Sequence, residues 1–181
     1  MNTFIIRMAE PDDLPLLFLY LDDHLQDNGR NGMPLFQPMS RADSRFTPEK
    51  AALFANGLDI AVGERGWRRP WIAVDPAGNI VGHIDLRGRP ERAAWHRAML
   101  GMGVHRNYRR QGVGAQLIDT ALTWAVNQRF LEWIDLEVLS VNLGARRLYE
   151  RLGFVTVGEV PDMFHIDGEE HGYVFMARKL R

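Results

Sequence analysis

The junction at residues 107–117, NYRRQGVGAQL, constrains the fold of this chain most strongly. The segment before it, 94–105, has the composition of a strand, and the segment after it, 113–129, has apolar residues at helical spacing. A helix N-terminus presents unpaired N–H groups and the positive end of the helix dipole. The junction adds two glycines, which permit close backbone approach, and two arginines. The pattern suits an anion site and suits equally a strand–helix turn with solvated arginines.

Two phosphate-binding motifs can be tested against the chain. No segment matches the P-loop pattern G-x-x-x-x-G-K-[ST]. The dinucleotide pattern G-x-G-x-x-G also fails, because its last position is Leu117 when counted from Gly112 and Arg106 when counted from Gly101. An anion site at the junction would therefore be of another type.

The remaining elements are expected from turn signals and periodicity. Expected helices run from Glu10 to about Asn28, from Thr47 to near Gly63 or Gly66, and from Asn142 to Gly153. Further expected strands are 4–7, 70–74, 80–86, 130–139, 155–159 and 173–177. The order β-α-α-β-β-β-α-β-α-β-β describes an α+β fold with a mixed central sheet, and we expect residues 1–181 to form a single domain. Residues 29–46 are expected to form a long loop, either a lid or a floppy connection.

Composition excludes several classes of function. The 181 residues include 22 basic and 23 acidic side chains, which argues against nucleic-acid binding through overall basicity. The absence of cysteine rules out disulfides, cysteine-ligated zinc and a cysteine nucleophile, and is compatible with a reducing cytoplasm. The N-terminus lacks the pattern of a signal peptide, and no apolar run reaches the roughly 20 residues of a membrane span. Five histidines show no metal-ligand spacing: His24, His83, His105, His165 and His171. We expect a cytoplasmic protein without a metal, nucleic-acid or membrane partner.

Two motifs together resemble a known family. The pattern R-x-x-G-x-G after a strand resembles the pyrophosphate loop of the GNAT N-acetyltransferases, which bind acetyl-CoA. A second signature of that family follows at the expected separation in VNLGARRLYERLGF, with Asn142, Ala145, Leu148, Tyr149, Gly153 and Phe154. The resemblance covers essentially the whole chain. It implies a GNAT-like acyl-CoA N-acyltransferase fold, with helices on both faces of a mixed sheet that is splayed between its fourth and fifth strands.

The resemblance also implies where coenzyme A lies. Backbone amides of the junction would hold the pyrophosphate, and the pantetheine would lie between the splayed strands 94–104 and 131–139. The implied cofactor-binding residues are Met102, Gly103, Val104, Arg109, Arg110, Gln111, Gly112, Val113, Gly114, Ala115 and Asn142. The glycines at 101 and 103 suit a bulge or a close approach, or only a kinked strand. Asn142 could contact the cofactor, cap a helix, or do both.

Acetyl transfer to an amine needs a proton acceptor for the amine and a proton donor for the leaving thiolate. Tyr149 matches the family tyrosine near the sulfur of coenzyme A; it is either the general acid or a packing residue. The position of the carboxylate base in some family members is Ala98 here. His96 should share its strand face, and an unperturbed histidine pKa of roughly 6.5 suits a base. Glu137 and an ordered water are the other options, and His96 could also be a structural histidine.

The expected activity is transfer of the acetyl group of acetyl-CoA to a primary amine by direct attack in a ternary complex. The acceptor would be a small molecule or a peptide amine such as a protein N-terminus. Two other classes of function remain open: a catalytically inactive CoA-binding sensor or regulatory module, and a structural domain whose arginine loop is merely solvated. The sequence names neither the acceptor nor the oligomeric state, and a homodimer is compatible with it.

Overall fold

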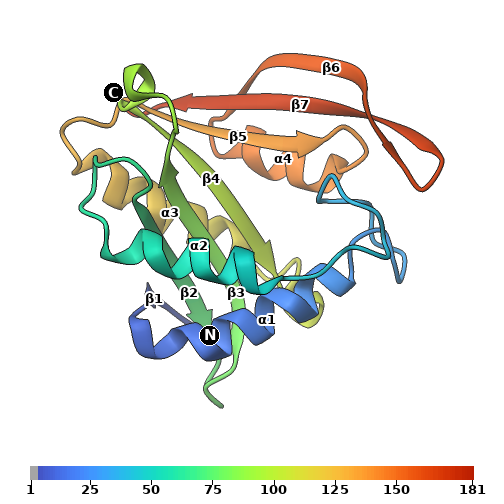
Figure 1. Cartoon of the computed structure of the whole chain (residues 1–181), viewed down its shortest axis with the longest axis horizontal. Helices are drawn as coiled ribbons and strands as arrows, with labels where there is room; N and C mark the ends of the chain where they lie inside the picture. The colour runs from blue at the N-terminus through green and yellow to red at the C-terminus, as the bar shows by residue number, and fades with distance from the viewer. Residues whose placement is uncertain (1–3) are drawn as a thin grey trace.

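A seven-stranded mixed sheet organises the computed structural model, which describes residues 4–181 (Figure 1). The strands are β1 (Ile5–Met8), β2 (Arg68–Val74), β3 (Ile80–Gly88), β4 (Arg97–Val104), β5 (Trp133–Leu139), β6 (Val155–Ile166) and β7 (Glu169–Lys179). Their order in the sheet is β1-β2-β3-β4-β5-β7-β6. Neighbouring strands are antiparallel except for the parallel pair β4 and β5. The expected α+β class and mixed sheet are confirmed.

The sheet opens between β4 and β5. These strands pair at Arg97 with Trp133, at Ala98 with Ile134 and at Met99 with Asp135. Beyond these pairs both strands continue, to Val104 and to Leu139, without pairing to each other. The expected splay between the fourth and fifth strands is therefore confirmed. Backbone N–H and C=O groups along the split lack a strand partner, so an extended ligand between the strands can pair with them.

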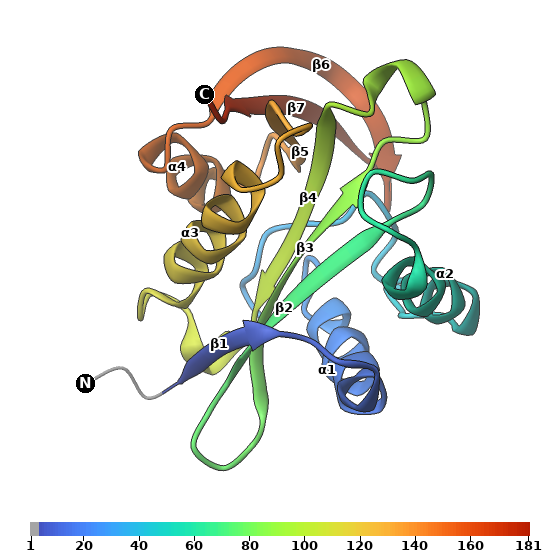
Figure 2. The ribbon, with the colours of Figure 1, turned by 90° about the vertical axis from the view of Figure 1, so that its left-hand side faces the viewer.

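Helices cover both faces of the sheet (Figure 2). Helices α1 (Leu14–Gln26) and α2 (Pro48–Asp59) lie on one face; α3 (Val113–Val126) and α4 (Leu143–Arg151) lie on the other. Even-numbered residues of β4 and β5 join the large core that includes α3, and odd-numbered residues point to the α1/α2 face, because side chains alternate along a strand. No helix within residues 4–181 combines the length and apolar character needed to cross a membrane.

Local side-chain contacts set the helix ends. Thr47 caps α2 by accepting from the N–H of Lys50 at 3.4 Å. The helix ends at Asp59, earlier than the expected Gly63 or Gly66, because the Arg69 guanidinium donates to the carbonyls of residues 57, 58 and 60. Asn142 caps α4 as expected, since its side chain accepts from the N–H of Ala145 at 3.3 Å.

Several strand boundaries differ from expectation. β4 begins at Arg97 rather than at Ala94, because residues 92–94 form a short 3-10 turn. β6 and β7 are longer than expected and form a hairpin, closed by Asp167 and Gly168 with φ angles of 52° and 84°. Two residues with positive φ in this order suit the turn that joins antiparallel strands, and Asp-Gly is a strong sequence signal for it.

The loop between α1 and α2 packs against the rest of the protein. The side chain of Asn28, which is fully buried, accepts from the N–H groups of residues 36 and 37 and donates to Ser44 Oγ at 2.9 Å. Arg41 donates to the Asp167 carboxylate at 2.7 Å, which ties the loop to the β6–β7 turn. Leu35 packs in a small core with Leu139 and Ile166. The loop is thus held by its own hydrogen bonds and lies beside the end of the split at Leu139.

Candidate active site

The β4–α3 junction presents free backbone donors. Gly112 precedes α3 with a φ of 85°, a left-handed conformation that glycine adopts without strain. No side chain caps this helix, and its first backbone bond runs from Gln116 N–H to the Gly112 carbonyl at 3.1 Å. The N–H groups of residues 113–115 therefore precede the intrahelical ladder. They converge with the positive end of the helix dipole, which suits an anion.

The two arginines of the junction have different surroundings. Arg109 donates to the Val104 carbonyl at 3.0 Å and to the buried Asp27 carboxylate at 3.3 Å. Arg106 binds the same carboxylate at 3.0 Å, so both arginines fasten the junction to the end of α1. Arg110 is exposed and adopts a φ of 61°, which turns the chain into the glycine loop. Arg110 is thus the arginine that this junction exposes to solvent.

Gly114 allows three elements to meet at the mouth of the split. A Cβ added to it would lie 3.2 Å from Leu148 of α4 and 3.3 Å from Met102 of β4. The first turn of α3 therefore sits directly against both β4 and α4. This contact brings the free amides of α3 to the end of the unpaired part of β4.

Tyr149 lies in α4, which follows β5. Its ring packs edge-on against Phe154, 5.8 Å between centroids, and belongs to the large core. Burial raises the pKa of Tyr149, so its hydroxyl is protonated at neutral pH. No hydrogen bond joins this hydroxyl to another residue of the described chain. The packing interpretation is therefore observed, and the general-acid role stays a prediction.

The two expected base candidates lie at different positions along the split. His96 precedes β4, and its carbonyl accepts from the N–H of Glu132 at 2.8 Å at the end where β4 and β5 are still paired. The expectation that the strand includes His96 was wrong, because a 3-10 turn at residues 92–94 moves the start of β4 to Arg97, so strand alternation does not place the His96 side chain on the face of Ala98. Glu137 lies on β5 beyond the last paired residue and is exposed on the α1/α2 face. Glu137 thus borders the open part of the split.

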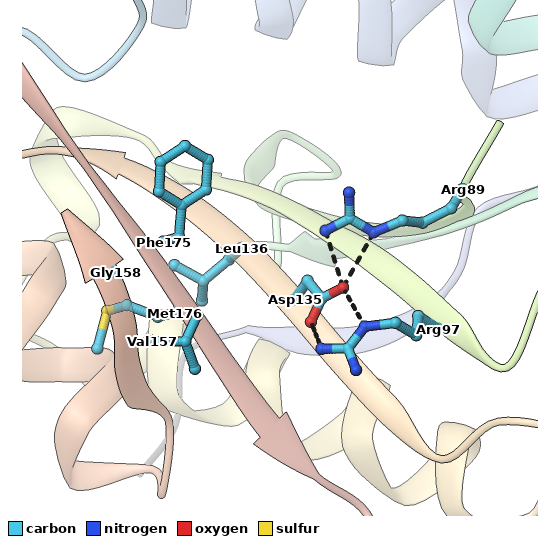
Figure 3. Close-up of a pocket in the computed structure, with 8 residues that line it drawn as sticks. All are labelled: Arg89, Arg97, Asp135, Leu136, Val157, Gly158, Phe175 and Met176. Carbon is cyan, nitrogen blue, oxygen red and sulfur yellow. Dashed lines mark hydrogen bonds and ion pairs between the residues drawn. The ribbon is translucent and has the colours of Figure 1, made fainter. Parts of the chain in front are cut away.

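Two groups of ion pairs lie beside the split on the α1/α2 face, one around Asp85 and one around Asp135. The sequence analysis did not predict them. Asp85 of β3 lies between Arg68 and Arg87, with N–O distances of 3.2 and 3.3 Å. Asp135 of β5 lies between Arg89 and Arg97, as Figure 3 shows. Both carboxylates are about 95% buried, whereas the arginines are partly exposed, so each group keeps one surplus positive charge at the surface.

A pocket of about 360 Å³ lies beside the group around Asp135 (Figure 3). Its polar wall is the group of Arg89, Asp135 and Arg97, and its other walls come from β5, β6 and β7. The lining residues on those walls are Leu136, Val157, Gly158, Phe175 and Met176. Asp135 is the last residue of β5 that pairs with β4, so the pocket begins where the split begins.

The glycines of β4 make room for buried side chains on this face. A Cβ on Gly103 would overlap His24 Nε2 of α1 and lie 2.9 Å from His83 of β3. Burial lowers the pKa of His83 to about 4 and that of His24 well below its usual range, so both rings are neutral at pH 7. A Cβ on Gly101 would lie 3.0 Å from both Arg87 and Asp85. Within residues 4–181, no group of three or more potential metal-ligating side chains occurs.

Comparisons with known proteins agree with this arrangement. The sequence model described as "Acetyltransferase (GNAT) family" matches residues 37–154. The L-amino acid N-acetyltransferase AaaT of Escherichia coli (strain K12) is 30% identical over 103 residues, which cover 56% of this chain. The match spans 62% of that relative's length.

Solved structures match over nearly the whole chain. An acetyltransferase of the GNAT family from Streptococcus pneumoniae superposes with a TM-score of 0.80 and 22% identity, covering 97% of this chain and 99% of that one. yncA from Salmonella typhimurium, solved with its cofactor acetyl-CoA, superposes with a TM-score of 0.79 and 16% identity, covering 99% and 95%. These structures support the fold, and the sequence model supports the family over well over half of the chain. The chain therefore belongs to the acetyltransferase (GNAT) family.

Proposed function

We propose that this chain is an acetyl-CoA-dependent N-acetyltransferase that acts on a primary amine, with residues 1–181 acting as one catalytic domain. The observation that carries the proposal is the split between β4 and β5, which leads to the free amides at the start of α3. Backbone N–H groups of residues 110–115 bind the pyrophosphate of the cofactor. Backbone groups of residues 102–104 pair with the pantetheine, and Asn142 approaches it from the start of α4.

The acceptor amine enters from the α1/α2 face, and the reaction proceeds by direct attack. The neutral amine nitrogen forms a bond to the thioester carbonyl carbon, and the carbon–sulfur bond of acetyl-CoA then breaks. Tyr149 gives its proton to the leaving thiolate. Glu137 receives the proton from the amine, directly or through a water, because it borders the open part of the split whereas His96 lies at the paired end. The chain has no cysteine, so no cysteine acyl-enzyme takes part.

The acceptor is a small molecule or a peptide amine. The name of the Escherichia coli relative, an L-amino acid N-acetyltransferase, supports a small amine. The pocket of about 360 Å³ beside the split is also of a size for a small acceptor.

The test combines binding and turnover. Acetyl-CoA should raise the melting temperature, and thiol release should appear with at least one member of a panel of primary amines. Binding without release would support an inactive CoA-binding module instead, and absence of binding would support a structural domain.

Gly112→Asp tests the cofactor loop. It should weaken acetyl-CoA binding by roughly tenfold or more, because it sets a negative side chain against the pyrophosphate. Gly168→Asp is the matched control, since Gly168 has nearly the same φ of 84°, open space around it, and lies in the distant β6–β7 turn. Equal affinities of the two folded variants in calorimetry would remove the loop assignment.

A further inference from the structure

The pocket beside the split holds an arginine whose charge the protein does not balance. Arg97 alone satisfies Asp135, because its Nε donates to one carboxylate oxygen and its Nη2 donates to the other. Arg89 adds two further bonds to one of these oxygens, at 3.0 and 2.8 Å. One carboxylate therefore lies between two guanidinium groups, and the group carries one surplus positive charge. That charge faces the pocket in Figure 3.

The opposite walls of the pocket are apolar and shaped by an irregular strand. Phe175 of β7 stands across from Arg89, and Leu136 lies between Phe175 and Val157 of β6 (Figure 3). The pairing of β6 with β7 shifts between Thr156 and Gly158, which makes Val157 an extra residue in the strand. The pocket thus joins a cationic end to an apolar side, which is the pattern needed for a small ligand with an anionic group and an apolar part.

The surface charge changes sign from the pocket, where Arg89 is positive, to the split, where Glu137 is negative. Glu137 follows Asp135 on the same face of the strand, so the two Cα atoms are about 7 Å apart. Glu137 is exposed, and its neighbour among the described residues is the Tyr173 hydroxyl, which hydrogen-bonds to it, rather than an arginine. A ligand that spans the distance from Arg89 to Glu137 meets a positive group at one end and a negative group at the other. The order of charges matches a molecule with a carboxylate and an ammonium separated by a few bonds.

We infer that the acceptor is an amino carboxylate: Arg89 binds its carboxylate, the apolar wall at Phe175 contacts its side chain, and its amine points to Glu137 at the split. The inference rests on the proposed acetyl transfer and narrows its substrate class. A polyamine is disfavoured because its second ammonium would face the surplus arginine charge without a partner.

The test uses acceptors that differ only in the carboxylate. Thiol release is measured with L-phenylalanine and L-phenylalaninamide, with L-methionine and L-methioninamide, and with putrescine. The acids should give the higher kcat/KM, by roughly tenfold or more, because a charge-assisted bond to Arg89 forms only with the acid. The amide has the less basic amine and so the larger neutral fraction, which means that this preference runs against intrinsic reactivity. A preference for the amides or for putrescine would overturn the inference.

Arg89→Gln tests the residue itself. It should lower kcat/KM for the acids by roughly 10- to 100-fold, mainly through KM, and leave the amides unchanged. Asp135 keeps both bonds from Arg97, so the fold should tolerate the change. Arg92→Gln is the matched control, since Arg92 is exposed in the neighbouring 3-10 turn and does not line this pocket. An equal loss for acids and amides in Arg89→Gln would overturn the assignment.

The outcomes separate this inference from the proposed function. Release with amides or putrescine but not with acids removes the inference and keeps the acetyltransferase. If no amine releases thiol although acetyl-CoA binds, the proposed function fails. Calorimetry of the acid and amide pairs on the CoA-bound protein then decides the inference, with equal affinities overturning it and tighter binding of the acids supporting it.

Discussion

The two sides of the split are built in different ways. The side proposed for the cofactor uses backbone N–H groups from one contiguous segment, 110–115, at the start of α3. The side proposed for the acceptor uses Arg89, which directly follows β3, together with residues of β4, β5, β6 and β7, and its ion pair between Arg89 and Asp135 joins residues 46 positions apart in sequence. A site made of backbone depends on local conformation, so a short motif reveals it. A site made of side chains from several strands depends on sheet order, which no short motif encodes.

The two sides also differ in what substitution should change. No side chain caps α3, and the N–H groups of residues 113–115 precede its backbone ladder, so a substitution at Gly112 should affect binding more than stability. The acceptor side contains buried neutral histidines and buried carboxylates that each need their partners. Substitution there should affect stability as well as activity.

Tyr149→Phe should produce the largest change, and it should be confined to turnover. We expect kcat to fall by roughly 10² to 10⁴ while acetyl-CoA affinity stays within about twofold, because the phenyl ring keeps the packing against Phe154 and only the proton is lost. Steady-state kinetics and calorimetry of the same preparation check both quantities. Unchanged kcat would assign Tyr149 to packing alone and weaken the contrast between the sides.

Acid should destabilise the protein through the acceptor side. The pKa of His83 is lowered to about 4 by burial, with Asp85 raising it and Arg68 lowering it, whereas an unfolded histidine titrates near 6.5. Between these values the unfolded chain binds a proton that the folded protein excludes. The contribution of neutral His83 is therefore complete above about pH 6.5 and is lost as pH falls towards 4, by on the order of 3 kcal/mol.

Urea unfolding at pH 7 and pH 5 checks the histidine prediction. His83→Gln should reduce the loss of stability between the two pH values. His165→Gln, at an exposed position in β6, should leave it as in the wild type. Identical losses in all three proteins would show that His83 does not carry the pH dependence.

Two glycine substitutions should give effects of opposite sign. Gly103→Ala on the acceptor side should lower the free energy of unfolding by about 1–3 kcal/mol, because its Cβ overlaps the buried His24 ring. Gly144→Ala in the first turn of α4 has open space around it and should raise stability by up to about 1 kcal/mol. Denaturant unfolding of both variants measures the pair. An unchanged free energy of unfolding in Gly103→Ala would show that the α1/α2 face of the sheet accommodates the added methyl group.

The parts of the fold that local signals encode were predictable. The junction before Gly112 and the cap at Asn142 lie where the sequence indicates, because helix starts depend on residues within one turn. The splay between β4 and β5 came from resemblance to a family and not from any residue pattern. The hairpin at Asp167 and Gly168 carried a recognisable Asp-Gly signal, and the expected strands were nevertheless too short there.

The acceptor side was not predictable, for a physical reason. The alternation of side chains along a strand predicted that His96 and Ala98 face the same side. That rule assumes that both residues lie in the strand, but a 3-10 turn at residues 92–94 makes the strand begin only at Arg97. The pairing of Asp135 with Arg89 and Arg97 requires knowing that β3, β4 and β5 are neighbours in the sheet. Charged residues so far apart in sequence are interpreted as solvated surface residues until the order of the strands in the sheet is known.

The short parallel ladder between β4 and β5 has a consequence for local stability. Three residue pairs join these strands, whereas β5, β7 and β6 are held together along their length by antiparallel pairs. The segment from β5 onward therefore has the bonding of a separate cooperative unit that can open without the rest of the sheet. A ligand in the split would bond to both units and make their openings interdependent. Occupancy would then govern the rigidity of the whole sheet as well as the chemistry at its centre.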